Sequence, residues 1–193
     1  MTERTTDHPV EPLFLKRWSP RAFDASPFPE TDLLCMFEAA RWAPSAFNLQ
    51  PWRFLYALRD DAHWQDHLGL LDDFNRSWAH RASALVFVIS NTIMTQDNDT
   101  RPMRSHSFDT GAAWAQLALQ ATALGYHAHA MAGIDFDRTR EVLKVPDHFH
   151  IEVAVAVGMI SSPEDLPENL RQREKPSDRQ PLPTIAIAGA FPS

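Results

Sequence analysis

Three polar side chains that could bind a small molecule lie close together in the chain: Ser45, Asn48 and Gln50. Pro44 and Pro51 bracket them, and each proline disfavours helical geometry in the residue before it. The stretch is therefore predicted to be a rigid loop between a helix and a strand. A hydroxyl and two carboxamides supply donors and acceptors for one flat heterocycle with polar edges. The competing interpretation is a turn whose Asn and Gln bond their own backbone.

A second polar group, Arg17, Ser19 and Arg21, lies upstream. Because these residues are spaced by two, an extended segment would point all three the same way. Two guanidinium groups beside a hydroxyl suit a phosphate, which Arg binds in bidentate fashion. The alternative is an exposed basic loop. His127 and His129 would also share one strand face, but two imidazoles without a third ligand nearby predict no metal site.

Composition excludes several classes of protein. The 193 residues carry 18 basic and 25 acidic side chains, an acidic balance that argues against nucleic-acid binding. No apolar run approaches the roughly 20 residues that span a bilayer. Residues 1–10 are polar, lack the core of a secretory signal and are expected to be loosely ordered. The single cysteine, Cys35, excludes an internal disulfide and is expected to pack inside a helix. The expected compartment is the cytoplasm, with no membrane or nucleic-acid partner.

Hydrophobic periodicity predicts the elements that must position these groups. A short helix is expected to begin at Leu13, and the strand that carries the two histidines should end in a turn of small residues. The other expected helices are 32–42, 60–71, 109–124 and 135–143, and the other strands are 53–58, 84–90 and 151–158.

Two of these elements should organise the core. Residues 84–90 are continuously apolar, so their strand must be covered on both faces and is predicted to be central. Residues 109–124 are mostly apolar and rich in alanine, which predicts a helix buried nearly all round, in the core or at a subunit interface. The small face of the strand at 151–158 is expected to pack on this helix. Residues 91–106 show little periodicity and are expected to form a lid or binding loop for substrate.

The loop from Ala43 to Trp52 reads A-P-S-x-x-N-x-Q-P-W and resembles the signature of the nitroreductase family of FMN-dependent oxidoreductases. Further segments resemble family motifs in the family's order. They are R-x-S-x-R after the first helix, N-x-x-W at Asn75, D-x-G-A-A at the start of the long helix and R-x-P-L at Arg179. The resemblance extends from about Leu13 to Phe191.

The resemblance implies an α+β, three-layer fold in which helices flank a central, mostly antiparallel sheet, within one domain at 1–193. It also implies a homodimer with one FMN at each subunit interface. Residues 161–193 are expected to form an extended C-terminal arm that wraps the partner subunit. Its apolar stretch at 185–188 is the candidate for a strand added to the partner, because such a strand needs a surface to pair with.

The same resemblance assigns the cofactor contacts. It implies that Asn75 reaches the flavin pyrimidine ring, although a helix cap is its competing role. It implies that backbone N–H groups of Ala132 and Gly133 meet flavin N5 and O4, where a bare backbone can approach closely and stabilise the reduced ring. The implied set is Arg17, Ser19, Arg21, Asn75, Ala132, Gly133 and Arg179 from one subunit, with Pro44, Ser45, Ala46, Asn48 and Gln50 from the other.

The implied reaction is ping-pong. NADH or NADPH passes hydride to the flavin and leaves, and a small electron-poor acceptor such as a nitroaromatic or quinone then takes two electrons. The cofactor carries the redox step, so no side chain is named as catalytic. Three alternatives stay open: another FMN reaction such as enone reduction, dehydrogenation or dehalogenation, a non-catalytic flavin-binding module, and a protein without flavin.

Overall fold

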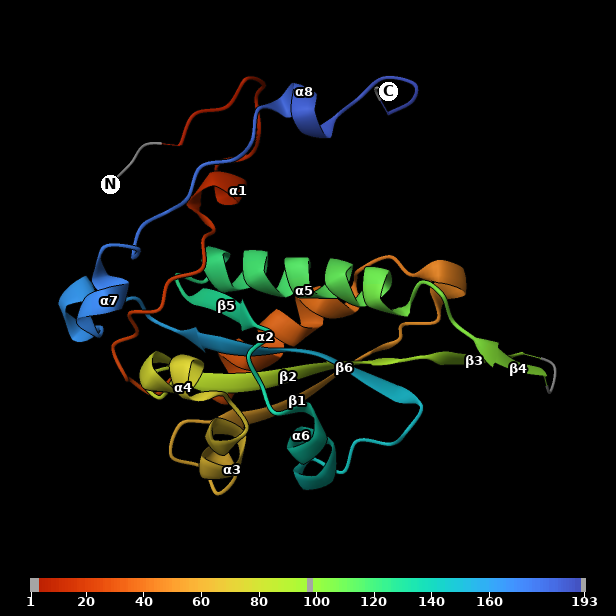
Figure 1. The fold of residues 1–193 in the computed structure, drawn as a ribbon, viewed down its shortest axis with the longest axis horizontal. Helices are drawn as coiled ribbons and strands as arrows, with labels where there is room; N and C mark the ends of the chain where they lie inside the picture. Colours follow the sequence, from red (N-terminus) through yellow and green to blue (C-terminus); the bar gives the residue numbers. More distant parts are fainter. Residues whose placement is uncertain (1–3, 97–98, 192–193) are drawn as a thin grey trace.

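A four-stranded antiparallel sheet forms the centre of the molecule (Figure 1). The computed structural model describes residues 4–96 and 99–191. Strand β2 (Ala84–Asn91) is flanked by β1 (Trp52–Leu58) and β6 (Phe149–Gly158), and β5 (His127–Met131) pairs with the far side of β6. Residues 84–90 are buried throughout, which confirms the prediction of a central strand.

Helices cover both faces of this sheet, which confirms the predicted three-layer α+β architecture (Figure 1). The long helices α2 and α5 pack on each other over one face. Three shorter helices lie over the other face. The bounds are α2 (Glu30–Arg41) and α5 (His106–Ala123) for the first layer, and α3 (Trp64–Gly69), α4 (Asp73–Ala79) and α6 (Phe136–Val142) for the second. Outside them lie α1 (Pro12–Lys16), α7 (Glu168–Arg171), α8 (Leu182–Ile185) and the 3-10 turns η1 (Ala46–Asn48) and η2 (Pro163–Asp165).

The two faces of β6 pack in the opposite sense to the one predicted. Val155 and Val157 lie in the core formed with α2 and α5, whereas Ala154 and Ala156 lie in the core on the other side. That second core contains large rings, among them Trp78. Size complementarity explains the arrangement: the small side chains of α5 leave room for valines, and the aromatic rings leave room only for alanines.

Helix α5 is buried on one side only, so the prediction of burial nearly all round is wrong for the single chain. Its buried residues include Ala113 and Leu117, whereas Gly111 and Ala115 are exposed and Phe108 is 83% exposed. An apolar composition predicts that other surfaces pack against a helix, but it does not identify whether they belong to the same chain or to another. Within the described ranges, no helix combines the length and the apolar character that crossing a bilayer requires.

Residues 91–106 contain a regular element where none was predicted. Strands β3 (Ile93–Gln96) and β4 (Asp99–Pro102) form an antiparallel hairpin that projects from the end of the sheet (Figure 1). Its base is packed through Met94 and Met103, while β4 is exposed along its length. An exposed strand such as β4 shows no hydrophobic periodicity, so the pattern did not reveal the hairpin.

Cys35 and the two chain ends also differ from expectation. Cys35 is exposed on α2 rather than packed. Part of the N-terminal prediction, residues 1–3, lies outside the described residues, but Arg4 is anchored through Nη1 to the carbonyls of Leu15 and Arg17. Residues 185–188 form no strand in this chain, because α8 takes up residue 185 and irregular backbone follows.

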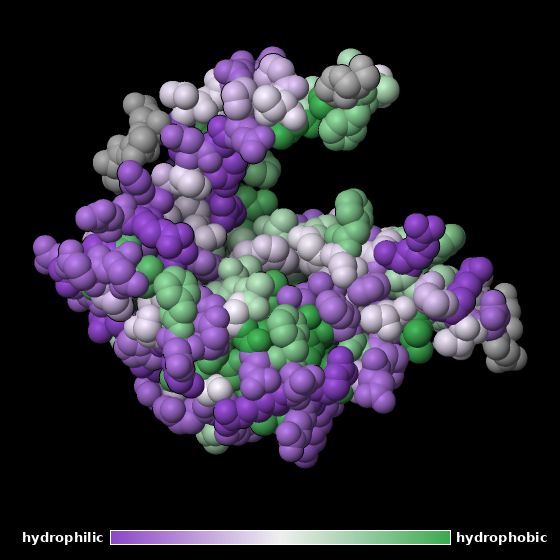
Figure 2. All heavy atoms as spheres, viewed as in Figure 1, coloured by the Kyte–Doolittle hydropathy of each residue, from purple (hydrophilic) through white to green (hydrophobic). Residues whose placement is uncertain are grey.

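The C-terminal segment extends away from the sheet and ends above α5 (Figure 1). A space-filling view shows an open space between this segment and the helix (Figure 2). Ile185 is 66% exposed and Phe191 is 91% exposed on this segment, and Phe108 faces solvent on α5. Two apolar surfaces thus stand apart in the single chain.

Candidate functional site

The loop that joins α2 to β1 adopts a strained conformation. Phe47, Asn48 and Gln50 have φ values of 52°, 56° and 48°, in the left-handed region that costs residues with a Cβ about 1–3 kcal/mol each. Ser45 supports it, because its Oγ accepts from the Gln50 backbone N–H at 3.0 Å. Gln50 Nε2 also donates to the Asn48 carbonyl at 3.1 Å. The competing interpretation of a self-bonded turn is therefore confirmed for Gln50, but within the described residues no contact of this kind supports it for the Asn48 side chain.

A buried carboxylate, Asp109, ties this loop to the first turn of α5. Its Oδ2 accepts from the Ala46 backbone N–H and from Ser105 Oγ, each at 3.0 Å, and the side chain is only 4% exposed. Pro44 is exposed next to the helix end. Sequence reasoning used Asp109 only to mark where a helix begins. An acidic residue in the first turn of an apolar helix could have indicated that Asp109 bonds a neighbouring segment.

Arg17 and Ser19 lie together beside the middle of α5. Arg17 Nη1 donates to Ser19 Oγ at 3.4 Å. Both line a hollow of about 370 Å³ whose other walls are mostly apolar. Those walls are Phe14, Trp114, Ala115, Ala118, Leu119 and Ala130. A polar pair at the edge of an apolar hollow is an arrangement that suits a ligand with a flat apolar body and a polar end.

Three arginines gather at this edge. The pKa of Arg17 lies below its ordinary value, first because the group is half-buried and then because of the positive charges of Arg179 and Arg4. Arg179 is exposed, and its Nη1 donates to Ser177 Oγ at 3.1 Å. Arg4 and Arg179 both line a neighbouring hollow of about 560 Å³. Mutual repulsion among three cations favours an anion between them. Sequence reasoning missed Arg4, which falls in the segment expected to be loose.

Arg21 makes contacts of its own, and the prediction that it shares one face with Arg17 and Ser19 stays a prediction: the positive charges of Arg21 and Arg17 both lower the pKa of His129. The Arg21 guanidinium carbon lies 5.9 Å from the ring centroid of Trp78, in the layer on the other side of the sheet. Its backbone N–H donates to Glu174 Oε1 at 2.7 Å. This bond joins residues 153 positions apart, so the local spacing could not reveal it.

The two histidines of β5 hold the arginine segment in place. His129 Nδ1 donates to the Pro20 carbonyl at 2.8 Å, and His127 stands edge-on to Trp18 with ring centroids 6.0 Å apart. Burial lowers the pKa of His129 to about 4 and lowers the pKa of His127 as well. The described part of the chain contains no group of three or more His, Cys, Asp or Glu side chains that could hold a metal ion. The pair is a packing feature.

This burial predicts a stability that falls in mild acid. His129 stays neutral in the folded state down to about pH 4, whereas the unfolded chain binds the proton from its ordinary pKa of 6.5. The stabilising contribution of neutral His129 should therefore be fully present above pH 6.5. As the pH drops to about 4, the free energy of unfolding should fall by about 3 kcal/mol through His129 alone. Urea unfolding across this range measures it. His129→Gln should flatten the dependence by that amount, and His8→Gln at an exposed site should not.

Asn75 and Gly133 are brought into direct contact. Asp72, not Asn75, caps α4, because its Oδ1 accepts from the Asn75 backbone N–H at 2.7 Å. The competing prediction that Asn75 is a helix cap is therefore wrong. Its side chain is buried, and Nδ2 donates to the Gly133 carbonyl at 3.1 Å. A Cβ at Gly133 would overlap Asp72 Oδ2 and Asn75 Nδ2, so glycine is required here for contacts within the chain. Ala132 beside it is exposed.

The predicted residues thus form separate groups in one chain. The loop is bonded to the first turn of α5 at Asp109, whereas the hollow beside Arg17 reaches α5 only from Trp114 onward. The residues from 109 to 114 rise about 7.5 Å along a helix. Across residues 4–96 and 99–191, no hydrogen bond joins the loop to Arg17 or Ser19. Figure 1 shows the loop and α1 toward opposite ends of α5.

Comparisons with known proteins agree on one family. The nitroreductase family model matches residues 15–71 and 59–159. A solved structure described as an oxidoreductase containing FMN is 50% identical, with a TM-score of 0.96 over 98% of this chain and 96% of its own. A protein from Thermus thermophilus named NADH dehydrogenase is 30% identical over 90% of this chain and 92% of its own length. An enone reductase of gut-bacterial fatty acid saturation is 25% identical, with a TM-score of 0.67 over 78% of this chain and 88% of its own.

Proposed function

Because this chain belongs to the nitroreductase family, we propose that it is an FMN-dependent oxidoreductase that passes electrons from NADH or NADPH to a small electron-poor acceptor. The observation that carries the proposal is the half-buried Arg17, which shares the edge of an apolar hollow with Ser19 and lies close to the charges of Arg4 and Arg179. The similarity to an oxidoreductase containing FMN supports the same cofactor here.

The residues present fit FMN on physical grounds. Arg17, Arg179 and Arg4 bring like charges together, and a phosphate would relieve that repulsion. Asn75 offers a buried amide, and its oxygen would accept from an N–H on a heterocycle. Gly133 lets Asn75 approach its carbonyl, which fixes where that amide lies. The mostly apolar walls of the hollow beside Arg17 suit an isoalloxazine ring.

The chain supplies position and electrostatics for this chemistry. When bound, FMN supplies the two-electron redox step. The apolar walls of the hollow keep water away from a ring system seated there. Backbone N–H donors at Ala132 and Gly133 would favour negative charge beside them, and the bonded loop at Ser45 would present its polar groups without further ordering.

We propose that the active form is a homodimer in which the Ser45–Gln50 loop of one subunit completes the flavin site of its partner. The loop and the arginine group lie apart in one chain, so a second copy is needed to bring them to one ligand. The exposed apolar residues of α5 and of the C-terminal segment, such as Phe108 and Ile185, would be covered in the dimer. Sedimentation equilibrium should give twice the mass of one chain; a monomer that binds FMN fully would contradict this arrangement.

One experiment tests the proposed function directly. The purified full chain should carry flavin absorbance, or acquire it on titration with FMN. Anaerobic addition of NADH or NADPH should bleach that absorbance, and a quinone or nitroarene should restore it in a second step. A bound flavin that neither nicotinamide reduces would reject the reductase assignment, and a chain that binds no FMN would reject the cofactor.

The acceptor has a second candidate class. The similarity to an enone reductase favours an α,β-unsaturated carbonyl compound as the oxidant of the reduced enzyme. Reoxidation rates with a quinone, a nitroarene and an enone, measured on the same reduced sample, separate the two classes. A rate with the enone at least tenfold above the others would replace the quinone or nitroaromatic assignment.

A further inference from the structure

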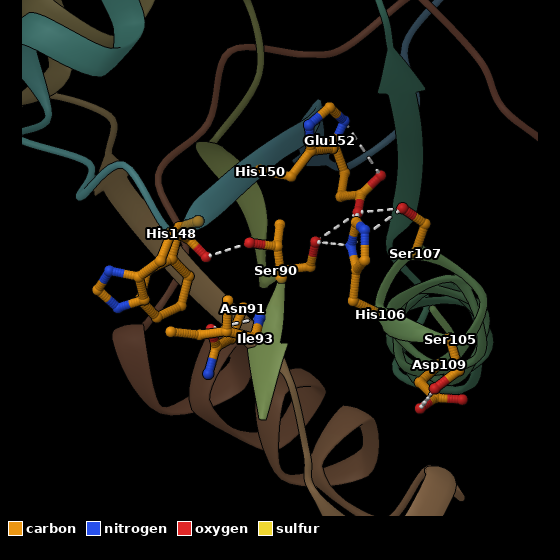
Figure 3. A network of polar contacts seen from close by, with 12 residues as sticks. Ser90, Asn91, Ile93, Ser105, His106, Ser107, Asp109, His148, His150 and Glu152 are labelled. Carbon is orange, nitrogen blue, oxygen red and sulfur yellow. Dashed lines mark hydrogen bonds and ion pairs between the residues drawn. The ribbon is translucent and has the colours of Figure 1, made fainter. Parts of the chain in front are cut away.

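A network of polar side chains joins the start of α5 to the middle of the sheet (Figure 3). Ser90 on β2 lies with its Oγ 2.6 Å from Glu152 Oε1 on β6 and 2.7 Å from His106 Nδ1 on α5. Ser107 Oγ lies 2.7 Å from the same Glu152 oxygen. Ser90 is fully buried, and the Glu152 side chain is 19% exposed. His150 lies farther out, with Nε2 3.9 Å from Glu152 Oε2.

The donors and acceptors in this network have one consistent assignment. Each serine hydroxyl has a single proton, and both short contacts to Glu152 Oε1 need that proton. Ser90 Oγ must then accept from His106, which places a proton on His106 Nδ1. The carboxylate therefore holds the first turn of α5 against the sheet through Ser107 directly and through His106 by way of Ser90.

The same turn of α5 holds the signature loop. Ser105 and Asp109 flank the two residues of the network, and Asp109 accepts the Ala46 N–H of the loop. Ser90 pairs with Trp52 at the start of β1, but among the residues that the structure describes no hydrogen bond joins Glu152 or Ser90 to residues 45–50. Backbone in the left-handed region at Phe47 and its neighbours persists only where the surroundings hold it. The position of Asp109 is therefore a condition for the loop conformation, and the network bonds the helical turn that carries Asp109.

We propose that Ser90, His106 and Glu152 are positioning residues that place the Ser45–Gln50 loop through the first turn of α5. The loop is the part of each subunit that the partner's flavin site needs, so this inference rests on the proposed function. If Glu152 loses its acceptor atoms, the first turn of α5 loosens, Asp109 moves, and the Ala46 N–H is released.

Hydrogen–deuterium exchange of the flavin-free full chain tests the proposal without any activity measurement. Glu152→Ala should raise exchange at residues 45–50, read apart from Trp52 in β1, by about tenfold, as expected for the loss of one hydrogen bond to a charged group. The FMN dissociation constant, followed by flavin fluorescence, should rise by a similar factor. Glu152→Gln keeps Oε1 as an acceptor and should stay within about twofold of the wild type. Glu141→Ala, at an exposed site on α6, is the matched control.

Ser90→Ala provides a second route, because it removes the acceptor of His106 with little change in volume. It should raise exchange at the same residues, and it serves if Glu152→Ala does not fold. Increased exchange confined to β2 and β6, with the loop peptides and FMN affinity unchanged, would overturn the proposal. A wild-type chain that binds no FMN would instead reject the proposed function, and the exchange of the loop would still test the positioning role.

Discussion

The Arg17→Ala/Arg179→Ala double variant is expected to fold and to be purified without flavin. Each arginine would contribute charge-assisted hydrogen bonds to the FMN phosphate, worth about 1.5–3 kcal/mol apiece. Their joint loss should weaken FMN binding by roughly 10²–10⁴-fold. The folded chain should not suffer, because Arg179 is exposed and Arg17 repels it. Fluorescence titration measures the affinity, and thermal unfolding of the flavin-free protein measures the stability.

Arg138→Ala is the matched control for the double variant, because Arg138 is exposed on α6 in the opposite layer. It should bind FMN like the wild type. If the double variant retained the wild-type affinity, the phosphate would have to lie elsewhere. The single variants should each lose part of the affinity, and the double variant the larger part.

Gly133→Ala is expected to lower the free energy of unfolding by about 3 kcal/mol. The added Cβ would overlap Asp72 Oδ2 and Asn75 Nδ2. Neither neighbour can retreat freely: Asp72 caps α4 and its backbone N–H donates to the Gly133 carbonyl at 3.1 Å, and Asn75 donates to the same carbonyl. Relief of the overlap therefore breaks a helix cap or a buried hydrogen bond. Urea unfolding of the flavin-free protein gives the change.

Gly69→Ala serves as the comparison for this variant. A Cβ at Gly69 would meet only the Arg138 side chain, at an ordinary 3.9 Å, at the end of α3. It should stabilise the chain by about 0.5–1 kcal/mol, as alanine does in place of glycine in a helix. Equal stability of Gly133→Ala and Gly69→Ala would show that the turn after β5 yields without cost. Weaker FMN binding by Gly133→Ala than by Gly69→Ala would also place this turn at the cofactor.

The elements that depend on local rules were predictable from the sequence. Pro44 and Pro51 delimited the loop, and the apolar run at 84–90 identified the central strand. Asp135 caps α6 as its position before the helix predicts, by accepting from the Arg138 backbone N–H. The family motifs, read in order, led to the correct three-layer fold. In each case the residues responsible lie within a few positions of the structure they determine.

The parts that failed depend on residues distant in the chain. The spacing by two did not reveal that the Arg21 backbone N–H donates to Glu174 or that its guanidinium lies over the Trp78 ring. The same limit hid the hairpin at 93–102, because its exposed strand β4 is defined by pairing with β3 and carries no apolar pattern of its own. It also reversed the two faces of β6, because which face meets α5 depends on the volumes available in both cores.

By itself, then, the sequence determined where helices, strands and stops occur and which family motifs the chain carries. Only the tertiary structure decided that Asp109 reaches back to Ala46, that Asn75 donates to Gly133, and that Glu152 and Ser90 hold the start of α5. The physical reason is the separation in sequence over which each interaction acts. Backbone preferences and periodicity act over a few residues, whereas a hydrogen bond across 58 or 63 positions exists only once packing has brought its two ends together.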